Sequence, residues 1–262
     1  NNLTLISLLF NLYQKNYSGV KEIYSGGLGA FIYEFGNNYL RSDFAVSGIK
    51  INIDQAPLFS DYLGCASSLV GQKSDDILFT LGHNFALNNK SSIIASGLFG
   101  IPTHKNNILL KFDFGVAQVG IGAQVDGSYR FKKTSSILYG VRYIRFIKCK
   151  TKDNLGNSYD FSIGNLGNFL LSYRHGWNKH GLECGYSLTS LFGASIFPDF
   201  RNIIDEVGYL RNSFYAVYKY NFFINKTINR FLVNISYGFD SNPRIFGVKN
   251  AIGGWLSWNI SF

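Results

Sequence analysis

The stretch Phe231-Leu232-Val233-Asn234-Ile235-Ser236-Tyr237-Gly238-Phe239-Asp240 decides the fold of this chain. Its odd-numbered positions are all aliphatic or aromatic, whereas its even-numbered positions beyond Leu232 are Asn, Ser, Gly and Asp. Alternation with a period of two places the two sets on opposite faces of a β-strand. We therefore expect one face of this strand to contact an apolar environment and the other a polar one.

The same alternation recurs in residues 118–131, 161–174, 182–189 and 213–223. Most of these segments are longer than the strands of soluble proteins, which most often have about 5–6 residues. A tilted strand that spans a membrane needs about 9–11. The polar positions carry mainly Gly, Ser and Asn rather than the Lys and Glu of a solvated surface. This pattern favours a membrane barrel with a narrow polar interior over a soluble β-sandwich.

The composition agrees with an all-β chain that has a large apolar surface. Among 262 residues, 17% are aromatic, 28 are Gly, 4 are Pro and only 16% are charged, against about 25% in an average soluble domain. Intrinsic disorder is excluded, since it requires low hydrophobicity and high net charge. A bundle of membrane helices is excluded too, since no apolar run approaches the roughly 18 residues that a spanning helix needs.

We expect about twelve strands, within a range of 10–14, connected alternately by short turns rich in Asn, Lys and Gly and by longer segments. Residues 3–13, the first strand, could instead form a short amphipathic helix. The predicted turns and strands give one domain, residues 1–262, folded as an all-β, transmembrane, antiparallel up-and-down barrel with short periplasmic turns and long extracellular loops. The expected strands lie near residues 3–13, 23–35, 39–53, 76–87, 91–101, 117–131, 136–148, 160–174, 182–192, 209–223, 229–240 and 246–262, and the short turns at 36–38, 88–90, 132–135, 175–181 and 224–228.

Closure of the sheet follows from the hydrogen-bonding needs of the backbone. In hydrocarbon every N–H and C=O group must find a partner within the protein, so that only helices and closed barrels span a membrane. Aromatic residues at the short-turn ends of the apolar faces then suit an interfacial girdle. These residues are Phe35, Phe131, Tyr173, Phe222 and Phe262.

The C-terminal segment Ile252-Gly253-Gly254-Trp255-Leu256-Ser257-Trp258-Asn259-Ile260-Ser261-Phe262 alternates up to its last residue. It resembles the terminal strand of bacterial outer-membrane β-barrel proteins, which ends in an aromatic residue and is read by the barrel-assembly machinery. The resemblance implies a porin-like or related barrel in outer-membrane lipid, with an assembly signal at Trp258, Ile260 and Phe262. It also implies the assembly machinery as a partner during insertion, and it leaves open a larger envelope complex or a homo-oligomer.

Charged residues on the polar faces are predicted to line the lumen. Five are cationic and four are anionic, which favours a polar passage for small solutes with a mild preference for anions. The alternative is a ladder of salt bridges that fills and stabilises the barrel. The nine candidates are Arg41, Asp43, Asp126, Arg130, Arg142, Arg174, Glu183, Lys219 and Asp240.

The leading functional hypothesis is therefore a porin-like channel for passive diffusion of small polar solutes or ions. A second hypothesis is an interaction barrel with a plugged lumen, whose outer loops, such as 54–75 and 193–208, bind a partner. A third is an enzyme that processes lipid or peptide. The residues argue against it, because His104 has no paired carboxylate and His83 shares an apolar face. We expect no catalytic residues, no metal site and no cofactor.

The cysteines and the net charge give weaker indications. Cys65 and Cys149 fall in or beside predicted outer loops and could form a disulfide in an oxidising compartment, or stay free; Cys184 is expected to face lipid. The net charge of +9 is dispersed, and no nucleic-acid partner is expected. Because the chain has no Met, we expect an exported chain whose signal peptide has been removed, in the bacterial outer membrane.

Overall fold

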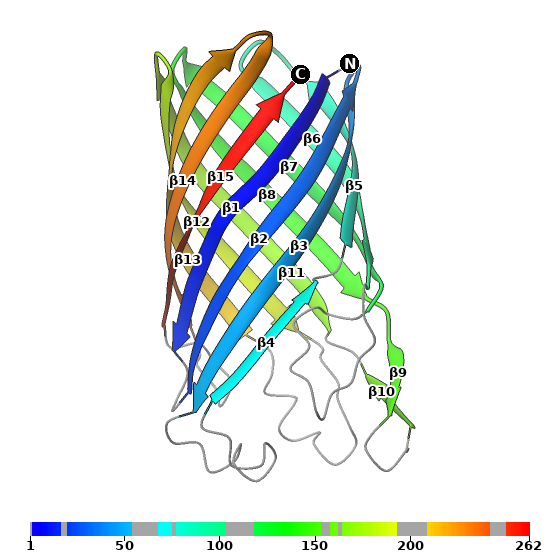
Figure 1. Cartoon of the computed structure of the whole chain (residues 1–262). Helices are drawn as coiled ribbons and strands as arrows, with labels where there is room; N and C mark the ends of the chain where they lie inside the picture. The colour runs from blue at the N-terminus through cyan, green and yellow to red at the C-terminus, as the bar shows by residue number, and fades with distance from the viewer. Residues whose placement is uncertain are drawn as a thin grey trace.

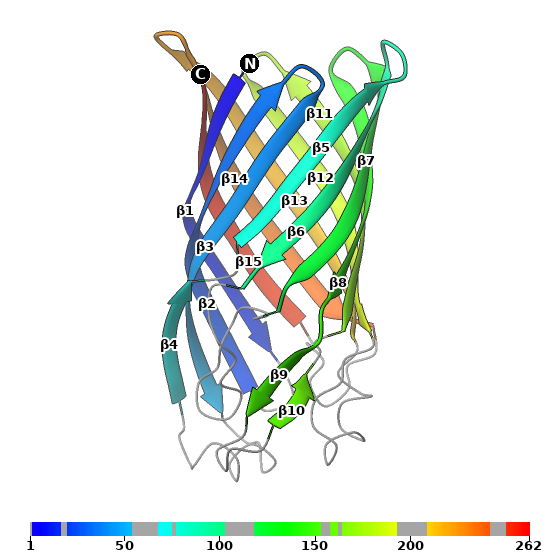
Figure 2. The same cartoon turned by 90° about the vertical axis from the view of Figure 1, so that its right-hand side faces the viewer.

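The strands of the computed structural model wind around a common axis and form a barrel (Figures 1 and 2). The structure describes residues 2–16, 20–53, 68–74, 77–102, 118–152, 158–161, 164–192, 209–241 and 250–262. Within these residues, no helix has the length and apolar character that crossing a bilayer requires.

Twelve of the described strands form the barrel wall, and each pairs antiparallel with its two neighbours. Strand β1 pairs with both β2 and β15, which closes the sheet, and the two termini lie together at the end that carries the short turns (Figure 1). The prediction of a twelve-stranded all-β barrel is thereby confirmed. The wall strands are β1 (Asn2–Asn16), β2 (Val20–Phe35), β3 (Asn38–Ile53), β5 (Ile77–Ala86), β6 (Ser91–Ile101), β7 (Gly120–Lys132), β8 (Ser135–Phe146), β11 (Asn165–Trp177), β12 (His180–Phe192), β13 (Tyr209–Ile224), β14 (Thr227–Asp240) and β15 (Asn250–Ser261).

Three short strands lie in segments that the sequence pattern assigned to loops. Strand β4 (Ser68–Ser74) pairs with the part of β3 that extends beyond β5. Because β3 is longer than β5, its backbone groups from Val46 to Asn52 would otherwise lack strand partners on that side. Strands β9 (Cys149–Lys152) and β10 (Ser158–Phe161) form a separate hairpin beyond the loop end of the wall (Figure 2).

The turn predicted at 175–181 is shorter than expected. Strand β11 continues to Trp177 and β12 begins at His180. A two-residue connection suffices because Asn178 adopts a positive φ of 50°, as the tightest hairpin turns require. Asn225, with φ of 52°, does the same between β13 and β14.

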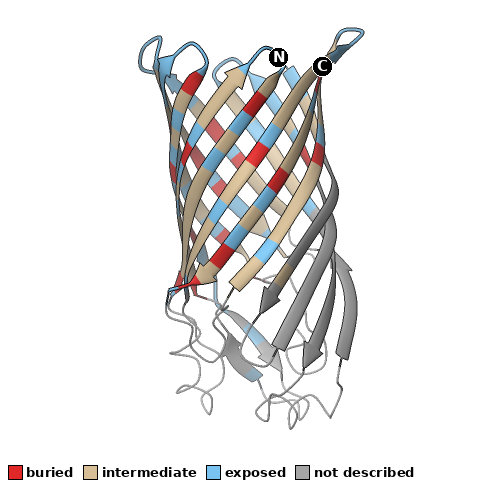
Figure 3. Cartoon of the chain, turned by 90° about the vertical axis from the view of Figure 1, so that its left-hand side faces the viewer, coloured by how far each residue is buried: buried red, intermediate tan, exposed pale blue. Residues whose placement is uncertain are grey.

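The two faces of the wall differ sharply in exposure. Large apolar side chains on one face are open to the surroundings, with exposed fractions of 66% for Ile235, 63% for Ile252 and 58% for Val141. Their neighbours along the same strands are buried or of intermediate exposure, as the alternating colours of Figure 3 show. The apolar face therefore forms the outside of the barrel, over an extent that a soluble monomer rarely exposes.

Aromatic rings gather on the outer face near the short turns. Phe131 and Tyr173 stack with centroids 6.0 Å apart, and Tyr33 and Phe35 stack at 5.8 Å. Amphipathic rings at this level suit the boundary between hydrocarbon and headgroups.

Two histidines join these rings. His175 and His180, which the sequence placed in a turn, instead lie in β11 and β12 and stack on Trp177 at 5.7 Å and 5.9 Å. The prediction for them was wrong because the alternation of Tyr173, His175 and Trp177 continues to the very end of the strand.

Candidate functional site in the barrel lumen

The strand register places all nine predicted lumen residues on the inward face. The assignment starts from Asn234, which is 6% exposed beside the 66% exposed Ile235. It extends from strand to strand through directly opposed pairs, such as Glu183 with Val217 and Val217 with Asn234. The role of the nine predicted residues in conduction stays a prediction.

Most of these charges gather in one zone. Most of them lie in the halves of their strands next to the short turns, with Asp126 at the middle of β7 and Arg142 just past the middle of β8. Glu34 joins them, because it opposes Tyr39 on β3, whose hydroxyl bonds the inward Ser96. This zone, called the charged belt below, contains six cationic and four anionic side chains, a formal net charge of +2 among the side chains that the structure describes. The members are Glu34, Arg41, Asp43, Asp126, Arg130, Arg142, Arg174, Glu183, Lys219 and Arg230.

Glu183 is the most extensively bonded carboxylate of the belt. Its Oε2 accepts from Nε and Nη2 of Arg174 at 3.0 Å and 2.8 Å. Its Oε1 accepts from the hydroxyls of Ser172 at 3.2 Å and Tyr215 at 3.1 Å. The charge of Glu183 is therefore compensated locally by Arg174.

Lys219 and Arg230 lie beside this pair without carboxylate partners within the described part of the chain. Electrostatic interactions link Lys219 to Arg174, Arg230 and Glu183. Arg230 donates from Nε to Oδ1 of Asn221 at 2.9 Å. This sector of the belt, from β11 to β14, carries an excess of positive charge.

The opposite sector is closer to neutral. Arg41 donates from Nε to both carboxylate oxygens of Asp43, at 2.9 Å and 2.8 Å. Arg142 interacts electrostatically with Asp126, Asp43 and Arg41. Since β3 and β8 are separated by β5, β6 and β7, the interaction between Arg142 and the β3 charges runs through the barrel interior, as inward-pointing side chains require.

Arg142 also has an incompletely satisfied guanidinium. Its Nε is buried and has no hydrogen-bond partner, and Asp126 instead accepts from Nε2 of Gln124 at 2.6 Å. A buried donor without a partner is uncommon. Arg142 is thus, like Lys219 and Arg230, a cation of the belt that no described ion pair neutralises.

Two inward arginines and one inward carboxylate, Glu34, were missed by the sequence analysis. Arg230 follows the parity of Leu232 and Asn234, and Arg211 follows that of Lys219, so that extending the alternation to the strand ends finds both. Arg211 donates from Nε to Oδ1 of Asp240 at 2.9 Å, and the Asp240 side chain is fully buried. This pair lies at the loop end, away from the charged belt.

The remaining candidates show no catalytic arrangement within the described residues. His83 faces outward, where its Nδ1 lies 2.7 Å from Oδ1 of Asn38 and its ring contacts Phe85. No group of three or more His, Cys, Asp or Glu side chains in the described ranges could hold a metal ion. Cys184 is a free, exposed thiol on the outer face, whereas Cys65, the Cys149 side chain and His104 lie outside the described residues, so the disulfide stays a prediction.

The proposed assembly signal occupies the outer face of β15. Trp258 donates from Nε1 to Oδ1 of Asn229 at 3.0 Å, which satisfies a buried amide on the outer wall. The backbone N–H of Phe262 donates to the carbonyl of Leu3 at 2.9 Å. Ile260 shares the outward face with both. These contacts join the end of the chain to β14 and β1, and the role of the three residues as a signal stays a prediction.

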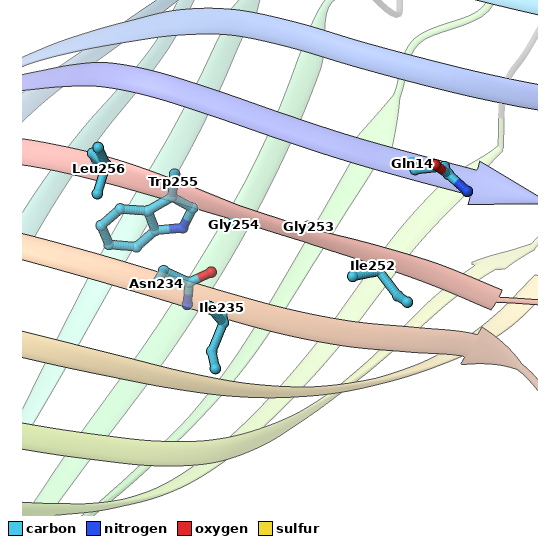
Figure 4. A pocket seen from close by; sticks show the side chains of 8 residues that line it. All are labelled: Gln14, Asn234, Ile235, Ile252, Gly253, Gly254, Trp255 and Leu256. Carbon is cyan, nitrogen blue, oxygen red and sulfur yellow. The ribbon is translucent and has the colours of Figure 1, made fainter.

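A shallow recess of about 500 Å³ lies in the wall where β1, β14 and β15 meet (Figure 4). It forms because Gly253 and Gly254 carry no side chains between Ile235, Ile252 and Leu256. None of the described residues that line it is charged, so the recess is separate from the charged belt.

Solved structures with this fold are bacterial outer-membrane barrels. An outer membrane channel from Pseudomonas putida F1 matches with a TM-score of 0.66 and 12% identity, over 99% of this chain and 93% of that one. The beta domain of the Bordetella autotransporter BrkA matches with a TM-score of 0.55 and 8% identity, over 100% and 99%. The translocator domain of the autotransporter NalP from Neisseria meningitidis matches at 0.54 and 9%, over 100% and 88%.

At these identities the likeness shows the fold alone, and the fold is that of bacterial outer-membrane β-barrels. No protein-family model matches the sequence, and no curated protein matches it.

Proposed function

We propose that this chain is a bacterial outer-membrane channel for passive diffusion of small polar solutes, with a preference for anions. The charged belt is the observation that carries the proposal. It gathers ten charged side chains on the inner face of a closed wall whose outer face is apolar, a distribution that suits hydrocarbon outside and water inside.

The net charge of the belt gives the sign of the selectivity. Ion preference in such pores follows the charge of the side chains that line them, and a low-dielectric wall strengthens the field of those charges. Six cations against four carboxylates favour chloride over potassium. Arg130, Arg142, Lys219 and Arg230 contribute most, because within the described residues no ion pair with a carboxylate neutralises them.

The orientation and the route to the membrane belong to the same proposal. Short turns face the periplasm and the longer connections face outward. The barrel-assembly machinery is proposed to recognise the terminal strand through Trp258, Ile260 and Phe262.

Reversal potentials in a planar bilayer test the channel. We expect stepwise conductance and, in a potassium chloride gradient, a potential of the sign for anion preference. The double variant Arg130→Gln/Arg142→Gln should reduce that potential, whereas Lys226→Gln, in the short turn after β13, should leave it close to wild type. Purified folded protein that produces no steps above the detergent background would refute the channel.

A filled structural barrel is the second candidate. Three ion pairs inside the wall support it, namely Arg41–Asp43, Arg174–Glu183 and Arg211–Asp240. Such pairs can fix the interior without leaving a passage. The same recordings separate the candidates, because a filled barrel conducts nothing while it keeps its heat-modifiable mobility in gels.

A further inference from the structure

Three cations of the belt face one part of the lumen near the short turns, called the hollow below. Arg174 and Glu183 oppose each other on β11 and β12, Lys219 opposes Gly181, and Arg230 opposes Asn221. Lys219 is displaced by two residues and Arg230 by four residues from the level of the Arg174–Glu183 pair. With strands about 4.8 Å apart and residues about 3.4 Å apart, the backbones of Arg174 and Arg230 are roughly 20 Å apart along the wall. The concave wall turns their side chains toward one another.

Two glycines lie beside these cations. Gly176 and Gly181 oppose each other on the inward face, next to Arg174 and Glu183 along their strands. A Cβ atom at Gly181 would contact Cβ of Lys219 at 3.7 Å and Cδ at 3.8 Å. The aliphatic part of Lys219 therefore lies over the position that a side chain at Gly181 would take, and the lysine extends toward β12.

The charges of the hollow do not cancel. Three cations face one carboxylate, and Glu183 is already committed to Arg174, Ser172 and Tyr215. Within the described residues, Nη1 and Nη2 of Arg230 and Nζ of Lys219 make no hydrogen bond. A formal charge of +2 and a set of free N–H donors thus face the lumen.

We propose that Arg174, Lys219 and Arg230 form a saturable binding site for a divalent oxyanion, inorganic phosphate or a small phosphorylated solute, at the short-turn end of the lumen. Guanidinium groups present paired donors that match the oxygens of phosphate. Chloride offers no such geometry, so the site discriminates among anions as well as against cations. The proposal rests on the channel function above and names the solute class that the channel favours.

Block of the chloride current by inorganic phosphate tests the site. In a phosphatidylcholine bilayer at constant ionic strength, phosphate should reduce the single-channel chloride current along a saturation curve. The variant Lys219→Gln/Arg230→Gln should weaken this block about tenfold or more, since it removes two cationic donors. Arg41→Gln, which changes a belt cation on β3 on the far side of the barrel from the hollow, is the matched control and should keep the block.

Phosphorus-31 NMR of the folded, detergent-solubilised barrel provides a readout that does not depend on conduction. Exchange broadening of the phosphate signal by wild-type protein, absent from the double variant, supports the site even if no channel opens. A conducting channel that phosphate does not block, or blocks equally in the double variant and the control, overturns the binding site and leaves the channel standing. Absence of both broadening and conductance overturns both proposals.

Discussion

Glu183 on β12 accepts two hydrogen bonds from the guanidinium of Arg174 on β11, directly opposite it and inside the barrel. The Glu183 side chain is 14% exposed and that of Arg174 is 42% exposed. Hydrogen bonds thus fix the carboxylate of Glu183, whereas the guanidinium of Arg174 remains partly accessible from the lumen. It contributes to both the stability of the wall and the charge of the belt.

Removal of the Glu183 charge should separate these two contributions. Glu183→Gln changes the formal charge of the belt from +2 to +3, so we expect a larger reversal potential in the anion direction. We also expect a loss of about 1–3 kcal/mol of unfolding free energy, measured by urea titration of the barrel in lipid vesicles. Arg174→Gln/Glu183→Gln restores the charge of +2, and its selectivity should return toward wild type; a selectivity unchanged by Glu183→Gln would contradict the assigned role of the belt.

A cation on the outer face should destabilise the barrel according to depth. Ile235 is 66% exposed near the middle of β14, and Ile235→Arg should cost about 2–4 kcal/mol. Phe35→Arg, next to a short turn, should cost about 0–1 kcal/mol because the arginine reaches the interface. Unfolding titrations in the same vesicles measure both values, and equal costs at the two positions would be inconsistent with a hydrocarbon belt around the wall.

The single described free thiol reports on the same surface. With Cys65 and Cys149 replaced by Ser, Cys184 should react in vesicles with an apolar maleimide and resist a sulfonated one, because the thiol faces lipid. Lys226→Cys in a cysteine-free background should react with both reagents, since it lies in a short turn. Mass spectrometry quantifies the labelling, and comparable labelling of Cys184 by the charged reagent would rule out a lipid-facing position.

The terminal aromatic residue should affect assembly more than stability. Phe262→Asp is expected to lower the amount of folded barrel in cell membranes several-fold, because the assembly machinery is proposed to recognise Phe262. Spontaneous refolding into detergent micelles should be much less affected. Phe35→Asp alters an aromatic residue at the same end outside the terminal strand, and an equal loss in cells for this variant would argue against a signal in β15.

Much of this architecture could be predicted because a barrel wall has only two environments. Each strand faces lipid on one side and the lumen on the other. The odd or even position in the strand was therefore enough to assign Arg174, Glu183 and Lys219 to the inward face. The rule was not applied at the strand ends. Arg230 and Arg211 were therefore omitted, because the alternation was not extended to the first residues of β14 and β13.

Features that depend on pairing rather than on parity could not be predicted. Strand β4 exists because β3 is longer than β5, a fact of register that no single segment reveals. The compact turn after Trp177 depends on a positive φ at Asn178, which many Asn residues do not adopt. The hollow around Lys219 requires four strands to be aligned before its residues become neighbours.

Two tryptophans on opposite faces of β15 test the central claim most directly, that lipid surrounds the wall and water fills the lumen. Trp258 shares the outer face with Ile260, whereas Trp255 opposes the buried, inward Asn234. In single-tryptophan variants in lipid vesicles, brominated acyl chains should quench Trp258 fluorescence strongly and Trp255 fluorescence little, and aqueous iodide should do the reverse. Equal quenching of both residues by iodide, with no effect of the brominated lipid on either, would contradict the account.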